Sequence, residues 1–265
     1  MNKYYAIGKI LFKAQAAYRF DVLMTAIGMI WRIVFALILW GVIYAERDMV
    51  GGFTYQAMLS YYVISSFFAV VDMSGGVAGE VSSRIKGGTF SKFMVIPSNP
   101  QLHFLSQTFG ASVYYGFFAA LAAVACSLVF GISITFTHDP LKIILAAGVF
   151  LLGAVFMNSF QFFLGIWAFK VQDAIFLTHV PEMIISFFTG ELVPLSLLPA
   201  VMARALRFFP FTHVVYTPTM LLAGGMDLPD GIAGLAALAA WTAAMALVSQ
   251  TTYGRLRRKY EGVGI

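Results

Sequence analysis

Charged side chains inside apolar runs are the residues of this sequence whose type and position could do chemistry. Arg32 and Asp72 interrupt two long apolar runs, and Glu191 ends a third. A charge near the centre of a membrane costs at least about 2.5 kcal/mol, so it usually has a partner or a function. Because Arg32 and Asp72 lie at comparable depth in neighbouring runs, we predict that they form an intramembrane ion pair. The alternative is that Arg32 reaches the interface and that Asp72 caps a kink at the following glycine pair.

No catalytic or cofactor-binding motif accompanies these charges. The sequence has no Gly-x-x-x-x-Gly-Lys-Ser/Thr phosphate loop, no His-Glu-x-x-His zinc motif and no Gly-x-Ser-x-Gly elbow. Its histidines are scattered, and its single cysteine, Cys126, stands in an apolar run. We therefore predict no catalytic residue, no metal site and no cofactor on this chain. Energy for uphill transport would come from an ion gradient or from an ATPase on another chain. Glu191 would either attract a cationic substrate or cap the next turn.

The elements that carry these charges are predicted to be membrane helices. Apolar residues make up 60% of the 265 residues and charged residues only 11%, against about 25% in a soluble domain. A helix needs about 20 mostly apolar residues to cross a bilayer. The sequence therefore predicts an all-α integral membrane protein with six transmembrane helices at residues 22–44, 55–79, 105–130, 141–169, 174–190 and 232–252.

Basic residues determine the predicted orientation. Twelve of the 17 Lys and Arg residues lie in the first 19 residues, in the connections after the second and fourth spans, and after the last span. Four lie in the opposite connections, and Arg32 lies within a span. Because basic residues gather on the cytoplasmic side, we predict a protein of the cell membrane with both termini cytoplasmic. The net charge of +5 then follows from topology, and no nucleic-acid partner is expected.

Two cytoplasmic segments have patterns of their own. Residues 2–19 place apolar side chains at helical spacing and lysines on another face, as in an amphipathic helix lying in the membrane interface. The alternative is a plain basic tail. Residues 80–100 are predicted to form a loop with a short helix that ends at a glycine pair, and Phe90 and Phe93 are expected to be exposed. Such a loop would dock on another protein or serve as an ordinary connector.

Residues 191–225, between the fifth and sixth spans, are apolar but cannot form one helix. Each proline removes a backbone donor and clashes with the preceding turn. Lipid does not tolerate unpaired backbone groups. We therefore predict a re-entrant or interfacial hairpin of short helices, interrupted at Pro194, Pro199, Pro210 and Pro218.

Two segments resemble sequences of a known family, the membrane components of type-2 ATP-binding-cassette (ABC) exporters. The stretch from Ile85 to Pro97, Ile-Lys-Gly-Gly-Thr-Phe-Ser-Lys-Phe-Met-Val-Ile-Pro, is similar to the coupling segment of this family. The stretch Phe-Phe-Thr-Gly-Glu-Leu-Val-Pro-Leu-Ser-Leu-Leu-Pro from Phe187, followed by Phe-Pro-Phe and Tyr-x-Pro, resembles the signature before the last span. The expected spans and amphipathic N-terminal segment also match, so the resemblance covers the whole chain. It departs at Phe93-Met94, where a leucine pair is more usual.

The resemblance implies a mechanism and a set of functional residues. Two permeases, identical or paralogous, would form the membrane core, and two ATPase subunits that bind ATP and Mg would dock below them. Substrate would pass between the protomers along the second and fifth spans. The coupling residues would be Val81, Arg84, Ile85, Lys86, Gly87, Gly88, Phe90, Phe93 and Pro97. The external gate would include Gly190, Glu191, Pro194, Pro199, Pro210 and Pro218.

Two other classes of function are weighed against the permease of an ATP-driven exporter. One is a secondary transporter or channel that works without an ATPase. Such proteins often repeat broken helices in both halves, whereas here the proline-rich break occurs once. The other is a membrane scaffold or an intramembrane enzyme, and no paired catalytic groups support an enzyme. The sequence does not name a substrate.

Overall fold

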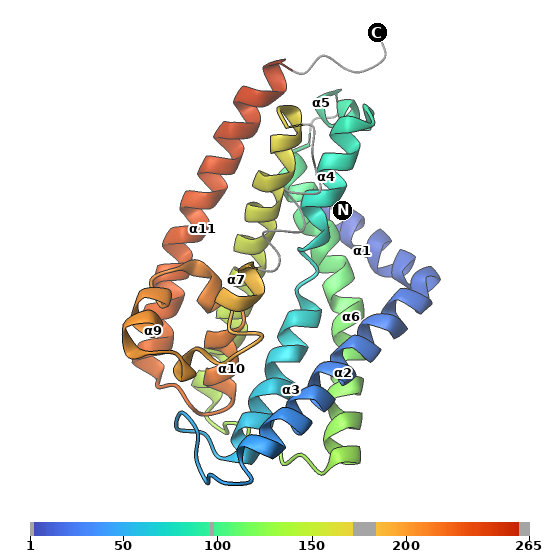
Figure 1. Ribbon diagram of the computed structural model, residues 1–265. Helices are drawn as coiled ribbons and strands as arrows, with labels where there is room; N and C mark the ends of the chain where they lie inside the picture. The colour runs from blue at the N-terminus through green and yellow to red at the C-terminus, as the bar shows by residue number, and fades with distance from the viewer. Residues whose placement is uncertain (1–2, 96–97, 172–183, 260–265) are drawn as a thin grey trace.

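The computed structural model describes residues 3–95, 98–171 and 184–259 as helices joined by loops (Figure 1). Five helical stretches among the described residues are long and apolar enough to cross a membrane. They contain α1 with α2, α3 with α4, α6, α7 with the turn that follows it, and α11. The expected fifth span at residues 174–190 falls mostly outside the described residues, and residues 184–188 of it are helical.

Helix boundaries in the middle of the chain follow from capping chemistry. Helix α6 (Pro100–Phe130) begins where the Asn99 side chain accepts hydrogen bonds from two backbone N–H groups, and it ends at Gly131, which has φ +63°. Helix α7 (Pro140–Ile166) begins in the same way at Asp139, whose side chain accepts from Leu141 N. A proline at the first helical position loses no bond, because that N–H has no partner inside the helix. Helix α6 therefore starts five residues before the expected span at 105–130.

The second expected span is not one continuous helix. Helix α3 (Tyr55–Val71) stops short of α4 (Gly76–Lys86), and residues 72–75 form a non-helical break between them. At this break the Asp72 carboxylate accepts a hydrogen bond from the Ser74 N–H at 3.1 Å. A short side chain that bonds to nearby backbone competes with the helical ladder. The expected span over 55–79 therefore lies within the candidate span Tyr55–Lys86, which contains this break.

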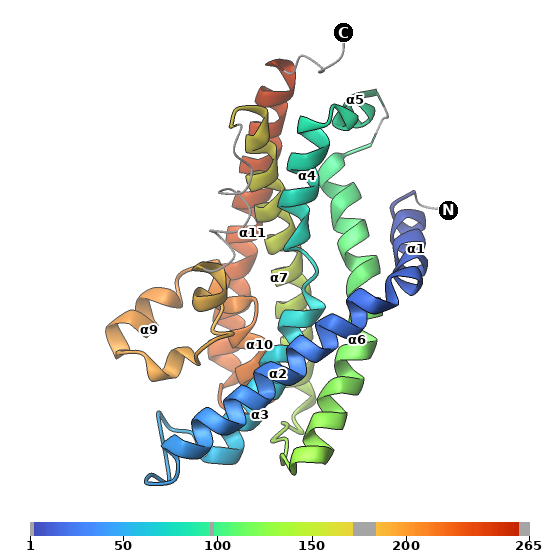
Figure 2. The ribbon, with the colours of Figure 1, turned by 45° about the vertical axis from the view of Figure 1, so that its right-hand side comes forward.

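The N-terminal helix α1 (Lys3–Gln15) packs along α6 and continues through the turn Ala16–Tyr18 into α2 (Arg19–Ile43). Gly8 and Gly110 meet at this crossing, where a Cβ atom on Gly110 would overlap the Gly8 backbone. Figure 2 shows α1 turning away from the line of α2 to lie beside α6. Of the helix predicted at residues 2–19, Lys3–Gln15 is α-helical and packs on α6, while its position in the membrane interface stays a prediction.

The proline-rich segment is a series of short helices, as its sequence predicts. They are η4 (Leu195–Leu197), α9 (Ala200–Leu206), η5 (Pro210–His213) and α10 (Tyr216–Leu222). Helix α10 is almost wholly buried and contacts α3, α7 and α11 (Leu228–Leu256). Helix α9 projects from the bundle (Figure 2). Each proline stands just before a short helix or in its first turn, where a missing N–H costs no internal bond.

The molecule has two distinct ends. Figure 1 places α1, α4, α5 (Lys92–Val95) and the last turns of α11 in its upper half. The loops 44–54 and 131–139 lie at the opposite end. The segments in which the sequence concentrates basic residues are thus gathered toward one end of the helices.

Candidate functional site

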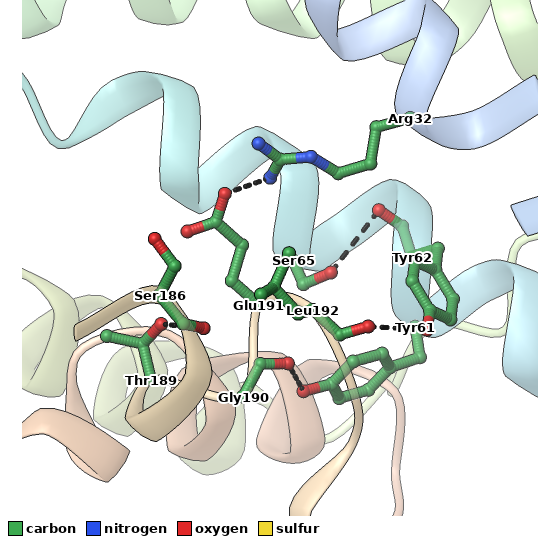
Figure 3. A network of polar contacts seen from close by, with 9 residues as sticks. All are labelled: Arg32, Tyr61, Tyr62, Ser65, Ser186, Thr189, Gly190, Glu191 and Leu192. Atoms are coloured by element: carbon green, nitrogen blue, oxygen red, sulfur yellow. Dashed lines mark hydrogen bonds and ion pairs between the residues drawn. The ribbon is translucent and has the colours of Figure 1, made fainter. Parts of the chain in front are cut away.

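An ion pair links the middle of α2 to the turn that precedes the short helices. The Arg32 guanidinium contacts the Glu191 carboxylate, as Figure 3 shows, and these side chains are 33% and 16% exposed. The predicted Arg32–Asp72 ion pair is therefore wrong. Asp72 instead caps the helix break, which is the alternative that its sequence context allowed. Glu191 has its own cation, so its charge is not free to attract a cationic substrate.

Two neighbouring tyrosines of α3 hold the same turn through its backbone. The Tyr61 hydroxyl donates to the Gly190 carbonyl at 2.6 Å, and the Tyr62 hydroxyl donates to the Leu192 carbonyl at 2.8 Å (Figure 3). A non-helical carbonyl that is buried needs a donor from the protein, and the two hydroxyls supply these donors. We call Arg32, Tyr61, Tyr62 and Glu191 the charge clasp.

Glycine is required at the centre of this turn. Gly190 has φ +77°, a conformation that residues with a Cβ rarely adopt. A Cβ atom there would also lie 3.0 Å from the Tyr61 hydroxyl and from the Tyr216 side chain. The backbone of Tyr216 closes the turn from the other side by donating its N–H to the Thr189 carbonyl at 3.0 Å. The clasp thus joins α2, α3 and the start of α10 in one unit.

The expected gate residues do not form one cluster. Gly190 and Glu191 belong to the clasp, whereas Pro194, Pro199, Pro210 and Pro218 are spread over the beginnings of the four short helices. Sequence reasoning missed Tyr61 and Tyr62. The signal was a pair of polar-tipped aromatic residues in the middle of an apolar run, where a hydroxyl must find a partner.

At the opposite end, α4, η2 (Thr89–Ser91) and α5 form a compact structure that we call the coupling bracket. Phe90 is fully buried and Phe93 is 5% exposed, so the expectation that these rings are exposed was wrong. They pack against α6, α7 and α11 in one apolar cluster with Val77, Val81, Ile85, Phe104, Phe162, Ile166, Tyr253 and Leu256. Gly165 of α7 allows this approach, because a Cβ atom there would lie 2.7 Å from Val81.

The outer surface of the bracket is basic and apolar. Lys86 and Lys92 are exposed, as are Met94 and Val95, and the exposed fraction of Val95 is 84%. Arg84 turns back instead, and its Nε donates to the Glu80 carboxylate at 2.9 Å.

Local backbone geometry explains why the bracket bends. Gly87 ends α4 by donating its N–H to the Ser83 carbonyl, and Gly88 reverses the chain with φ +72°. Of the expected coupling residues, Pro97 lies outside the described residues.

A buried polar network ties the long helices together between these two regions. The Gln101 amide of α6 donates to Ser159 of α7 at 2.8 Å and accepts from Ser249 of α11 at 3.0 Å. Asn158 of α7 donates to Thr108 of α6 at 2.9 Å. These contacts fix the lateral register of three membrane helices, because a mismatch would leave polar groups unpaired. They carry no pattern that suggests catalysis. Among the described residues, no group of three His, Cys, Asp or Glu side chains could hold a metal ion.

The arrangement defines a class, the multi-pass membrane proteins that bury polar contacts between their helices. Residues 30–264 match the family model described as ABC-2 family transporter protein. This range is most of the chain, so the protein belongs to the ABC-2 family of transporters, which the sequence resemblance had predicted. A separate comparison with curated proteins gave no match.

Proposed function

We propose that the chain is the permease subunit of an ATP-driven exporter. It lies in the cell membrane, crosses it six times and has both termini in the cytoplasm. Two permease chains, identical or paralogous, form the path. Two separate ATPase subunits supply the energy by binding ATP and Mg on the cytoplasmic side. Family membership supports a membrane transporter without catalytic groups of its own. It also favours this function over a secondary transporter or channel.

The observation that carries the proposal is the packing of the coupling bracket. Its short helices expose lysines and apolar side chains outward, while their aromatic rings are buried against three long helices. A displacement of the outer surface is therefore passed directly to α6, α7 and α11, because tightly packed side chains transmit displacement. An ordinary solvated connector would have no buried core of its own.

The break at residues 72–75 gives the movement a place to occur. Helix α4 belongs to the bracket, and α3 belongs to the charge clasp, while only four non-helical residues join them. Changes in backbone angles at such a junction let two rigid parts move relative to each other. When the ATPases close, the bracket and the long helices shift relative to α2, α3 and the clasped turn. The path along α3 and the fifth span then opens to the other side, with residues 192–222 as its external rim.

Co-purification with the ATPase tests this proposal. The chain is captured from mild detergent together with a co-expressed ATPase subunit of Walker type, and ATP hydrolysis is measured. The double variant Lys92→Glu with Met94→Asp changes only exposed positions and should lower the captured ATPase at least about tenfold, since several interface contacts are lost. Phe90→Asp is unsuited to this test, because it would place a carboxylate in the core.

The matched control is the double variant Arg47→Glu with Met49→Asp, which makes the same change of charge at two exposed positions of the opposite end. It should leave capture and ATP hydrolysis unchanged. Transport that persists in vesicles holding no ATPase would instead support a secondary transporter or channel. Equal loss of capture in both variants would show that charge, and not the bracket, governs association.

A further inference from the structure

A polar pocket lies between the first turn of α6 and the last turns of α11. Its volume is about 240 Å³, and its lining residues are Ser98, Asn99, Pro100, Gln101, Phe162, Gln250, Tyr253, Gly254 and Arg257. The Gln101 amide is already bonded to Ser159 and Ser249 in the helix network. The Asn99 carboxamide oxygen caps α6. The polar side chains that remain available to a ligand are therefore Ser98, Gln250, Tyr253 and Arg257.

The pocket combines a cation with donors that have no acceptor. Arg257 is exposed and forms no ion pair with any carboxylate of the described residues. Tyr253 is 8% exposed, and its hydroxyl, which interacts with the Arg257 side chain, has no hydrogen-bond acceptor within the described part of the chain. The Arg257 guanidinium lies 5.4 Å from the centre of the Tyr253 ring. A buried hydroxyl without an acceptor costs free energy that a bound oxyanion would recover.

A phosphate group fits this set of groups better than a carboxylate or a cation does. Guanidinium binds phosphate oxygens through two parallel hydrogen bonds, and the hydroxyl and the Gln250 amide add neutral donors. Among the side chains that line the pocket there is no Asp or Glu to repel an anion. A metal ion would find only weak, neutral ligands here.

The surroundings of the pocket indicate that this phosphate belongs to a lipid. The pocket lies where two membrane-crossing helices end, and lipid headgroups are found at that level. Within two helical turns of Tyr253, α11 exposes Leu247 and Val248. Helix α6 exposes Leu102, next to Gln101. An acyl chain could lie on these side chains while the headgroup phosphate enters the pocket. A free phosphate has no apolar group that could contact this surface.

We propose that this pocket binds the phosphate of an anionic phospholipid, held by Arg257 and the Tyr253 hydroxyl between α6 and α11. The bound lipid bridges the beginning of one helix and the end of another beside the coupling bracket. Its binding does not depend on the proposed orientation or on the ATPase, because both leaflets contain phospholipid.

The test uses the full chain in detergent, with phosphatidylglycerol retained after delipidation counted by native mass spectrometry. The wild type should retain one phosphatidylglycerol and should not retain diacylglycerol, which has the same chains without the phosphate. Arg257→Gln should weaken this binding about tenfold, because a charge-assisted contact is lost. Tyr253→Phe keeps the ring that packs on Phe90 and Phe162, and it should weaken binding about two- to threefold.

The control is Arg258→Gln, the neighbouring exposed arginine that does not line the pocket. Its affinity should equal that of the wild type. Unchanged binding in the Arg257 and Tyr253 variants would overturn the proposal, as would an equal loss in the Arg258 variant. Inorganic phosphate is the second probe. If it binds with the same dependence on Arg257 while no lipid is retained, the lipid assignment is overturned in favour of a free anion.

Discussion

The charge clasp and the coupling bracket both hold a non-helical turn against long helices, but by opposite chemistry. In the bracket, buried aromatic rings hold the turn, and its lysines lie on the outside. In the clasp, tyrosine hydroxyls and an ion pair hold the turn at residues 189–192. Water at the end of the molecule can satisfy the backbone of the bracket, whereas the clasped turn is buried against α3 and takes its partners from the protein. Polar contacts therefore mark where irregular backbone is buried between helices.

Removing the ring at the centre of the bracket should have the largest effect. Phe90→Ala empties a fully buried position and should destabilise the protein by about 3–5 kcal/mol. Val95→Ala, in the same bracket but with 84% of the side chain exposed, should change stability by less than about 0.5 kcal/mol. Unfolding of the purified protein in mixed micelles measures both. Similar values for the two variants would show that the bracket is not a packed structure.

Breaking the ion pair of the clasp should have the next largest effect. Arg32→Gln or Glu191→Gln alone leaves one charge without its partner and should cost about 3 kcal/mol. The double variant removes both charges, so its loss should be clearly smaller than the sum of the single losses. The same micelle unfolding measurement gives all three values. Simple additivity would mean that the two residues do not interact.

The hydroxyls of the clasp should contribute less than the charges. Tyr61→Phe and Tyr62→Phe each keep the ring but leave a carbonyl of the turn unpaired, which should cost about 1–2 kcal/mol. Tyr18→Phe is the control, because that ring is 59% exposed. If the control loses as much stability as the two clasp variants, the hydroxyl contacts do not hold the turn.

The smallest expected effect is a pH dependence at His213, in the short-helix segment. Burial lowers the pKa of His213 below its usual value. Its Nε2 lies 2.9 Å from the Arg207 carbonyl, which can only accept, so Nε2 carries the proton of the neutral ring and Nδ1 accepts from the Thr217 hydroxyl. As pH falls below about 6.5, the unfolded chain takes up the proton first, so stability declines; above that pH the residue contributes no slope.

His213→Gln isolates this effect. Glutamine can still donate to the Arg207 carbonyl but does not titrate. The loss of thermal stability between pH 7.5 and pH 5.5 should therefore be smaller in the variant than in the wild type. An identical or larger loss in the variant would exclude His213 as the cause.

The sequence predicted the parts of the fold that depend on local patterns. Apolar run length predicted six spans, and five of them coincide with helical stretches that can cross a membrane. The glycine pair and the prolines predicted the end of α4 and the short helices. The partner of Arg32 could not be predicted, because it depends on how a segment 159 residues later folds back onto α2. Likewise, Phe90 and Phe93 look like surface residues until α7 and α11 are seen to cover them.

The central claim is that the coupling bracket faces the compartment that holds ATP, and cysteine labelling tests it most directly. The single native cysteine, Cys126, is buried, so it gives little background. A cysteine is placed at Lys92 in the bracket or at Met49 in the opposite loop, both exposed. A membrane-impermeant maleimide should label Met49→Cys in intact cells and Lys92→Cys only after the cells are opened. Labelling of Lys92→Cys in intact cells, with protection of Met49→Cys, would contradict the account.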